Sequence, residues 1–248
     1  MKIRKITLLL CLLAKRLLGH FSGYSEQESA LVFQMLSFQK LRGDEKILHL
    51  GCRDGSLSRE IASKVPHGHL IGIDNTIPTT LTENNLILTS GDITTLQLQN
   101  TFDTVICTQN AEWDQNPTEL MQTIKSALKP GGIFILLLCV KESLPLTNPL
   151  SPYSLEVGRN ISSKTLHALL KKANFSQSTC SPKQFCAIYT NPELFKKEAT
   201  TCFFHTLQQL PPAEQDYHLQ QMLQILSQET QSPYISFPYT IEVGFAIK

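Results

Sequence analysis

A nine-residue segment, Ile47–Gly55 (ILHLGCRDG), constrains the fold of this chain more than any other part of the sequence. Its first residues predict a short buried strand, and Gly51 and Gly55 predict a tight turn from that strand into a helix. Such a turn lets a ligand approach the backbone closely, with helix N–H groups directed at it. Asp74 comes nineteen residues after Gly55, at the end of the next apolar segment, where a carboxylate can accept ribose hydroxyls. The combination indicates an α/β protein with a site for a nucleoside-containing cofactor.

The first 140 residues alternate apolar segments with helical patterns. The apolar segments predict strands at residues 46–50, 69–73, 86–89, 103–107 and 133–140, and a helix is expected over 56–65. Asn116 and Pro117 predict the start of another helix, with Glu119 completing a capping box and Pro130 marking its end. Apolar strands that alternate with helices are typical of a parallel sheet covered by helices on both faces.

The pattern changes on either side of this core. Ser25 and Glu28 predict a capping box at the start of an N-terminal helix. After a polar loop over 141–161, the sequence predicts a helix at 163–173, a strand at 184–190, and helices at 191–210 and 213–229. We therefore expect a single domain over residues 1–248, divided into N-terminal helices at 1–44, a cofactor-binding core at 45–140, a helical insertion or cap at 191–230 and a last strand at 238–248.

The first twenty residues allow three interpretations: a helix that docks on the core, a cleaved or anchoring signal, or a mis-set start codon. Basic residues precede a nine-residue uncharged run at 6–14, and Lys15 and Arg16 follow it at once. The run is about half the roughly 20 residues that a membrane-spanning helix needs. A docking helix and no membrane span are the expectation.

Charge and cysteine content exclude several classes of protein. Twenty-two Lys and Arg against 21 Asp and Glu give a net charge of +1, which argues against nucleic acid as a partner. The seven cysteines contain no CxxC pair, which favours a reducing cytoplasm without disulfides, and neither they nor the scattered histidines predict a metal site. The sequence carries no signal for the oligomeric state, and a monomer is the default expectation.

The glycine turn does not match the dinucleotide fingerprint, because Arg53 and Ser56 occupy its second and third glycine positions. It resembles instead the first motif of the class I S-adenosylmethionine-dependent methyltransferases. Three more segments resemble motifs of that family in the same order: Asp74 its ribose-binding acid, Ser90–Ile93 (SGDI) the element that meets the adenine amino group, and Leu128–Gly132 (LKPGG) the turn before its fifth strand. The resemblance implies a Rossmann-like, seven-stranded methyltransferase sheet with helices on both faces, and S-adenosyl-L-methionine as the cofactor.

The resemblance also implies a set of cofactor contacts at the ends of the strands. These are His49, Gly51, Cys52, Arg53, Gly55, Asp74, Asn75, Asp92, Ile93 and Thr108. Two of them depart from the family pattern, since His49 stands in place of an acid and Arg53 in place of a glycine. We predict that the Arg53 side chain points away from the cofactor, because Asp74 and Asp92 would have no use around a blocked pocket.

Residues 108–113 (TQNAEW) and 189–194 (YTNPEL) resemble carboxyl methyltransferases of the trans-aconitate, malonyl-carrier-protein and juvenile-hormone-acid types. This similarity implies methylation of a carboxylate on a small or carrier-bound acid, which needs no general base, and no catalytic residue is identified. Trp113 is either a core aromatic residue or a lid over the substrate, and Tyr24 either closes over the cofactor or has a core or surface role. The alternative function is a non-catalytic binding or regulatory protein whose cofactor site His49 and Arg53 have degraded.

Overall fold

The computed structural model describes most of the chain in two compact units. The described residues are 23–93, 98–108, 112–140, 161–189, 191–200, 207, 210–230 and 235–248. The larger unit contains residues 32–140, 161–183 and 240–248, and the smaller unit contains residues 23–31 and the described part of 184–239. Residues 1–22 and 141–160 lie outside the description, and with them the predicted docking helix and polar loop. The predicted division into one domain with an insertion stays a prediction.

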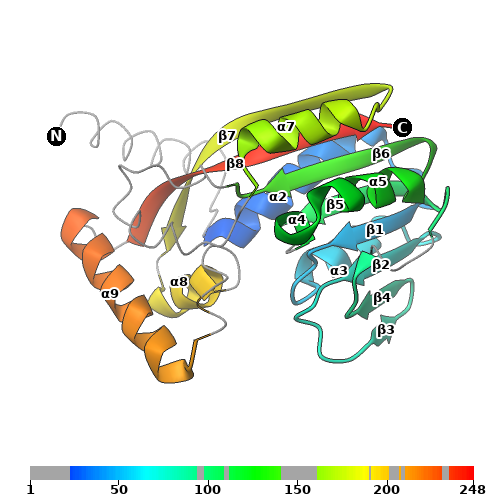
Figure 1. Ribbon diagram of the computed structural model, residues 1–248. Coiled ribbons are helices and arrows are strands. Elements are labelled where there is room, and N and C mark those ends of the chain that lie inside the picture. Colours follow the sequence, from blue (N-terminus) through cyan, green and yellow to red (C-terminus); the bar gives the residue numbers. More distant parts are fainter. Residues whose placement is uncertain are drawn as a thin grey trace. The chain divides into compact units, whose positions relative to one another are not determined.

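The fold is built on an eight-stranded mixed sheet with strand order β3-β4-β2-β1-β5-β6-β8-β7 (Figure 1). The strands are β1 (Lys46–Leu50), β2 (His69–Ile73), β3 (Leu81–Glu83), β4 (Leu86–Thr89), β5 (Phe102–Thr108), β6 (Leu128–Leu138), β7 (Gln177–Tyr189) and β8 (Ile235–Ile247). The five central strands, β4, β2, β1, β5 and β6, are parallel to one another, whereas β3 is antiparallel to β4 and β8 is antiparallel to β6. The predicted parallel arrangement is confirmed for these five central strands.

Helices cover both faces of this sheet in the larger unit. The helices within the described residues are α2 (Gly23–Gln39), α3 (Ser56–Ala62), α4 (Glu112–Gln115), α5 (Pro117–Ala127), α7 (Ser163–Lys172), α8 (Pro192–Glu198) and α9 (Pro212–Thr230). Figure 1 shows α5 and α7 along one face, where their apolar side chains join a single buried cluster with β1, β5 and β6. On the other face, Gln39 at the end of α2 accepts a hydrogen bond from Thr104 of β5. No helix within the described ranges is long and apolar enough to cross a membrane.

Several predicted boundaries are wrong for identifiable reasons. Helix α2 already includes Ser25, the predicted cap. Helix α3 ends at Ala62 and does not reach its predicted end at Val65, which precedes Pro66 and therefore disfavours helical backbone. The count of seven strands missed β3, whose three residues are all exposed and therefore carry no apolar pattern. Strand β7 begins at Gln177 rather than 184, because its first half is polar and lies at the edge of the sheet.

Candidate functional site

The segments that the sequence predicts to bind a cofactor meet at the carboxyl ends of β1, β2 and β4, which are neighbours in the sheet. The register places Leu50 opposite Ile73 and Ile73 opposite Thr89, so the three strands end at the same level. Two backbone hydrogen bonds tie the following residues together: Gly51 N–H donates to the Ile73 carbonyl (2.9 Å), and Asp74 N–H donates to the Thr89 carbonyl (3.1 Å). Residues 51–55, 74–75 and 90–93 therefore lie along one edge of the sheet.

The turn after β1 depends on left-handed backbone. Gly51 has a φ of 76°, Arg53 of 50° and Gly55 of 77°. A Cβ atom at Gly55 would lie 2.2 Å from Leu88 Cδ1, so glycine is required there for packing as well as for conformation. At Arg53 the same backbone region disfavours a side chain by roughly 1–2 kcal/mol. This conformation explains why glycine is the residue expected at position 53.

Asp74 anchors the turn from the end of β2. Its Oδ2 accepts the N–H of Arg53 (2.9 Å), and its Oδ1 accepts both the N–H (2.8 Å) and the hydroxyl (2.7 Å) of Thr76. A carboxylate offers about four acceptor positions, so these bonds leave room for one more donor, on Oδ2. The half-buried Asp74 can therefore accept one ribose hydroxyl as it stands, and accepting a second requires a Thr76 donor to move.

The N–H groups of the turn are largely used within the protein. The N–H of Gly55 donates to the Cys52 carbonyl, that of Ser56 to the Asp54 carboxylate, and those of Gly51 and Arg53 are bonded as described above. These four N–H groups are therefore not available to a ligand, which can still approach the backbone of the turn closely.

His49 is a buried polar link between three elements. Its side chain lies among β1, α3 and β5, with Nδ1 2.8 Å from Ser58 Oγ and Nε2 3.0 Å from Thr108 Oγ1. Because the Thr108 hydroxyl donates its single proton to the Gly51 carbonyl (2.9 Å), it must accept from Nε2–H. Ser58 then donates to Nδ1. Burial lowers the pKa of His49 to about 4, so the ring is neutral at pH 7 and both of its nitrogens are satisfied.

The other predicted contacts differ in exposure. Asp92 and Arg53 are half-buried, Asn75 is exposed, and Ile93 is buried in the apolar cluster. Burial raises the pKa of the Cys52 thiol to about 12, so it is protonated and not a nucleophile at neutral pH. The roles of these residues toward a cofactor stay predictions.

Trp113 of α4 is fully buried in the apolar cluster, and its indole N–H donates to Cys107 Sγ at 3.0 Å. This position matches the core interpretation, and a contribution to an acceptor site stays a prediction. The Tyr24 side chain lies outside the described residues.

Sequence reasoning missed two residues that hold the site together. Thr76 orders the Asp74 carboxylate, and the D-x-T spacing is a recognisable local turn that would have revealed it. Ser58 orders His49, and no local pattern indicates this pairing because the bond links a strand to the next helix.

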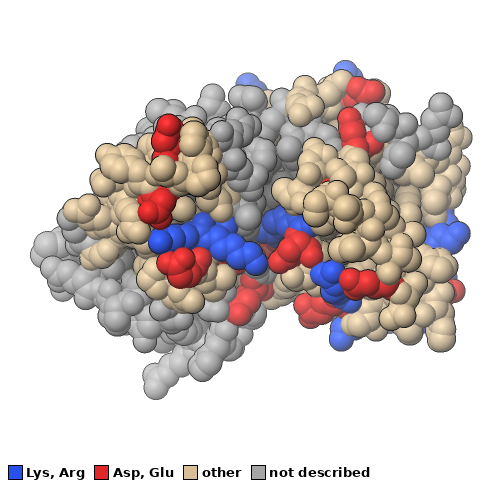
Figure 2. Space-filling view, turned by 90° about the horizontal axis from the view of Figure 1, so that it is seen from below, with Lys and Arg blue, Asp and Glu red and all other residues tan. Residues whose placement is uncertain are grey.

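Basic and acidic side chains are interspersed on the surface. Arg59 pairs with Glu83 at 2.9 Å, Lys129 with Asp103 at 2.8 Å, and Arg42 with Asp44 at 3.1 Å. Figure 2 shows the same mixing on one face, where Lys and Arg side chains lie beside Asp and Glu side chains.

The sheet order, the glycine turn after β1 and the acid after β2 together define a class I S-adenosylmethionine-dependent methyltransferase fold, whose cofactor is S-adenosyl-L-methionine. The family model described as "Methyltransferase domain" matches residues 24–177, more than half of the chain. The chain therefore belongs to the methyltransferase-domain family.

Similar proteins agree with this assignment. Malonyl-[acyl-carrier protein] O-methyltransferase of Haemophilus ducreyi is 28% identical over 140 residues, which are 50% of this chain and 54% of that protein. The chain thus spans about half the length of the curated relatives it matches. The solved structure of YcgJ from Bacillus subtilis has a TM-score of 0.57 at 15% identity and covers 90% of this chain and 98% of its own. Phosphoethanolamine N-methyltransferase 2 of Haemonchus contortus, solved with S-adenosyl-L-methionine, has a TM-score of 0.60 at 15% identity over 92% of this chain and 53% of its own. These two structures share the fold.

Proposed function

We propose that the protein transfers the methyl group of S-adenosyl-L-methionine to a carboxylate oxygen of a small or carrier-bound acid. The observation that carries the proposal is the Asp74 carboxylate, which is bonded to the glycine turn and keeps one acceptor position for a ribose hydroxyl. The similarity to malonyl-[acyl-carrier protein] O-methyltransferases supports a carboxylate acceptor.

Each part of the cofactor has a proposed partner at the strand ends. Asp74 Oδ2 accepts a ribose hydroxyl, and Asp92, after β4, accepts from the adenine amino group. The methionine part lies against the turn at Gly51–Gly55, where the left-handed backbone of Gly51 carries no Cβ atom that would stand in the way of a ligand. The bound cofactor supplies a methyl group on a positively charged sulfur, which is open to in-line attack.

The site residues fit a reaction without a general base. A carboxylate acceptor is already ionised at pH 7, so the protein needs only to align it with the methyl group and exclude water. His49 is neutral, buried and bonded at both nitrogens, and the Cys52 thiol is protonated. Neither side chain is arranged to take a proton from an acceptor.

Calorimetry with S-adenosylmethionine and S-adenosylhomocysteine tests the cofactor site. Asp74→Ala should weaken binding by about 1–3 kcal/mol, because a ribose hydroxyl loses a charged acceptor. Glu60→Ala, which removes an exposed acid from α3, is the matched control and should leave affinity unchanged. Equal affinity in Asp74→Ala and the parent protein would show that Asp74 does not bind the ribose.

Transfer is then measured with malonyl-carrier protein and a panel of free carboxylic acids, by mass spectrometry of the methyl ester. Methylation of any member supports the proposal.

Two observations favour a non-catalytic alternative, namely the burial of His49 where an acid is expected and the side chain at Arg53. Absence of binding to both cofactor forms would make that alternative the better account.

A further inference from the structure

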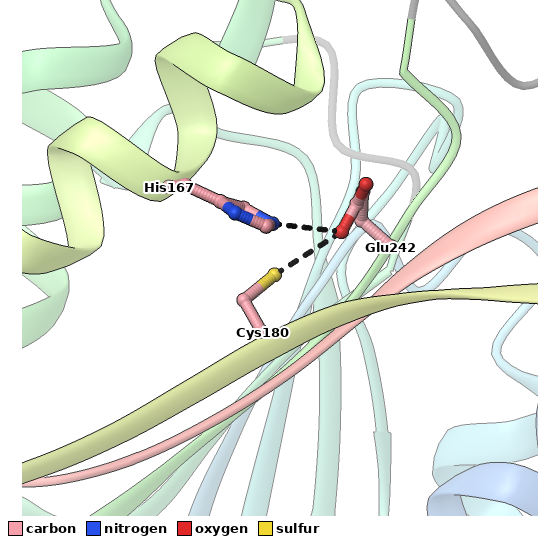
Figure 3. A group of neighbouring side chains, drawn as sticks. All are labelled: His167, Cys180 and Glu242. Carbon is pink, nitrogen blue, oxygen red and sulfur yellow. Dashed lines mark hydrogen bonds and ion pairs between the residues drawn. The ribbon is translucent and has the colours of Figure 1, made fainter.

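Three side chains that can bind a metal converge outside the cofactor site. Figure 3 shows His167 of α7, Cys180 of β7 and Glu242 of β8 pointing toward one another. Their ligand atoms all lie within 4.8 Å of one another, with His167 Nε2 3.1 Å and Cys180 Sγ 3.4 Å from Glu242 Oε2. All three residues belong to the larger unit.

Glu242 is the buried centre of this group. Its side chain is 2% exposed, and a carboxylate so far from water requires compensating partners. Ser163, one helical turn before His167, donates its hydroxyl to Glu242 Oε1 at 2.6 Å. This bond fixes the carboxylate orientation and leaves Oε2 facing His167 and Cys180.

We propose that His167 Nε2, Cys180 Sγ and Glu242 Oε2 form a zinc-binding site. An imidazole, a thiolate and a carboxylate are a donor set that suits Zn²⁺, which binds them at about 2.0–2.3 Å in tetrahedral geometry. Such bonds place neighbouring ligand atoms roughly 3.3–3.7 Å apart. The separations from Glu242 Oε2, 3.1 and 3.4 Å, are close to this range, and the remaining pair, His167 and Cys180, has its ligand atoms within 4.8 Å of each other. Ser163 orients the carboxylate as outer-shell partners of metal ligands do.

Zinc binding releases protons from its ligands. The Cys180 thiol releases its proton to solvent, and His167 carries its remaining proton on Nδ1 so that Nε2 can bind. The His167 side chain is 42% exposed, which gives the ion a route from solvent, and a water molecule completes the fourth position.

The position of the group separates it from the proposed cofactor site. Glu242 pairs with Leu138 near the carboxyl end of β6, and β8 lies three strands from β1 in the sheet. At about 4.8 Å per strand this is roughly 14 Å from the glycine turn along the sheet. The ion would link α7, β7 and β8, and the proposal does not depend on the acceptor or on methyl transfer.

The test uses the full chain, purified under reducing conditions and freed of metal with a chelator. Zinc affinity is measured by competition with a chromophoric chelator, and Co²⁺ serves as a spectroscopic probe. We expect one equivalent of bound zinc and a sulfur-to-cobalt charge-transfer band. Cys180→Ser should abolish the band and weaken zinc binding by more than about a hundredfold, since outer-shell losses alone reach roughly that size.

Cys186→Ser, on the same strand, is the matched control and should keep both the band and the affinity. If Cys180→Ser does not fold, zinc affinity is measured on His167→Gln instead, and it should be weakened as well. This half-exposed side chain can be replaced at little structural cost, and circular dichroism verifies the fold. Failure of the parent protein to bind one equivalent, or affinity unchanged by these two substitutions, would show that the group is only a hydrogen-bonded network around Glu242.

Discussion

Position 53 combines a left-handed backbone with a long side chain, and glycine would relieve the conflict. The φ of 50° disfavours arginine by roughly 1–2 kcal/mol, but glycine loses more conformational entropy on folding. We expect Arg53→Gly to raise the free energy of unfolding by about 0.5–1 kcal/mol, measured by urea denaturation. Lys40→Gly, also at a φ of 50° but after α2, should give a similar gain. A loss of stability in Arg53→Gly alone would mean that the contacts of the arginine side chain outweigh the cost of its backbone conformation.

The same substitution tests whether Arg53 obstructs the cofactor. If its side chain points away, Arg53→Gly should change the affinity for S-adenosylhomocysteine by less than about threefold, because the Asp74 bond to the backbone N–H is kept. Lys40→Gly should leave the affinity unchanged. A gain of about tenfold, or 1.4 kcal/mol, would show that the natural residue blocks the site and would favour the non-catalytic alternative.

At the scale of elements, α5 has a cap that the sequence predicts and the structure confirms. The Asn116 side chain accepts the N–H of Glu119, and Pro117 occupies the first helical position. Asn116→Ala should lower the free energy of unfolding by about 1 kcal/mol, because a backbone donor loses its partner. Asn116→Ser, which restores an oxygen acceptor, should recover most of the loss. Equal stability of all three proteins would show that solvent satisfies this end of the helix.

The segment at 191–230 is proposed to select the acceptor. In the smaller unit it contains α8 and α9, whose buried side chains include Phe195, Met222 and Leu226. Replacing residues 191–230 with a short linker should leave S-adenosylhomocysteine affinity within about threefold while abolishing transfer, because the cofactor partners lie after β1, β2 and β4. Calorimetry and a transfer assay are compared on a variant with native circular dichroism. A large loss of affinity in such a folded variant would contradict this assignment.

For the whole molecule, the sequence predicts what depends on local pattern. The buried parallel strands were predictable because they carry apolar residues on both faces. The proximity of the glycine turn to Asp74 was predictable because the carboxyl ends of parallel strands meet at one edge of the sheet. The bonds of His49 to Ser58 and Thr108 were not predictable, because they join residues that only the tertiary fold brings together. The grouping of His167, Cys180 and Glu242 was not predictable from the sequence for the same reason.

The pH dependence of stability should report the burial of His49 at the centre of the sheet. Its pKa falls from 6.5 to about 4 on folding, because the buried site disfavours the charged ring. Because the folded protein binds this proton more weakly than the unfolded chain, the free energy of unfolding is not reduced by His49 above pH 6.5. It decreases as the pH falls from 6.5 toward 4, by roughly 3 kcal/mol in all. Charging the ring would place a cation among β1, α3 and β5, so the loss concerns the larger unit as a whole.

Urea denaturation between pH 4 and pH 8, for the parent protein and His49→Gln, measures this contribution. Glutamine keeps hydrogen-bonding groups at position 49 but does not titrate, and the difference between the two curves removes the effect of the carboxylates. We expect the parent protein to lose stability relative to His49→Gln as the pH falls from 6.5 to 4, because only the parent must charge or unfold. A difference that stays constant over this interval would show that His49 keeps an ordinary pKa in the folded protein and is hydrated rather than enclosed.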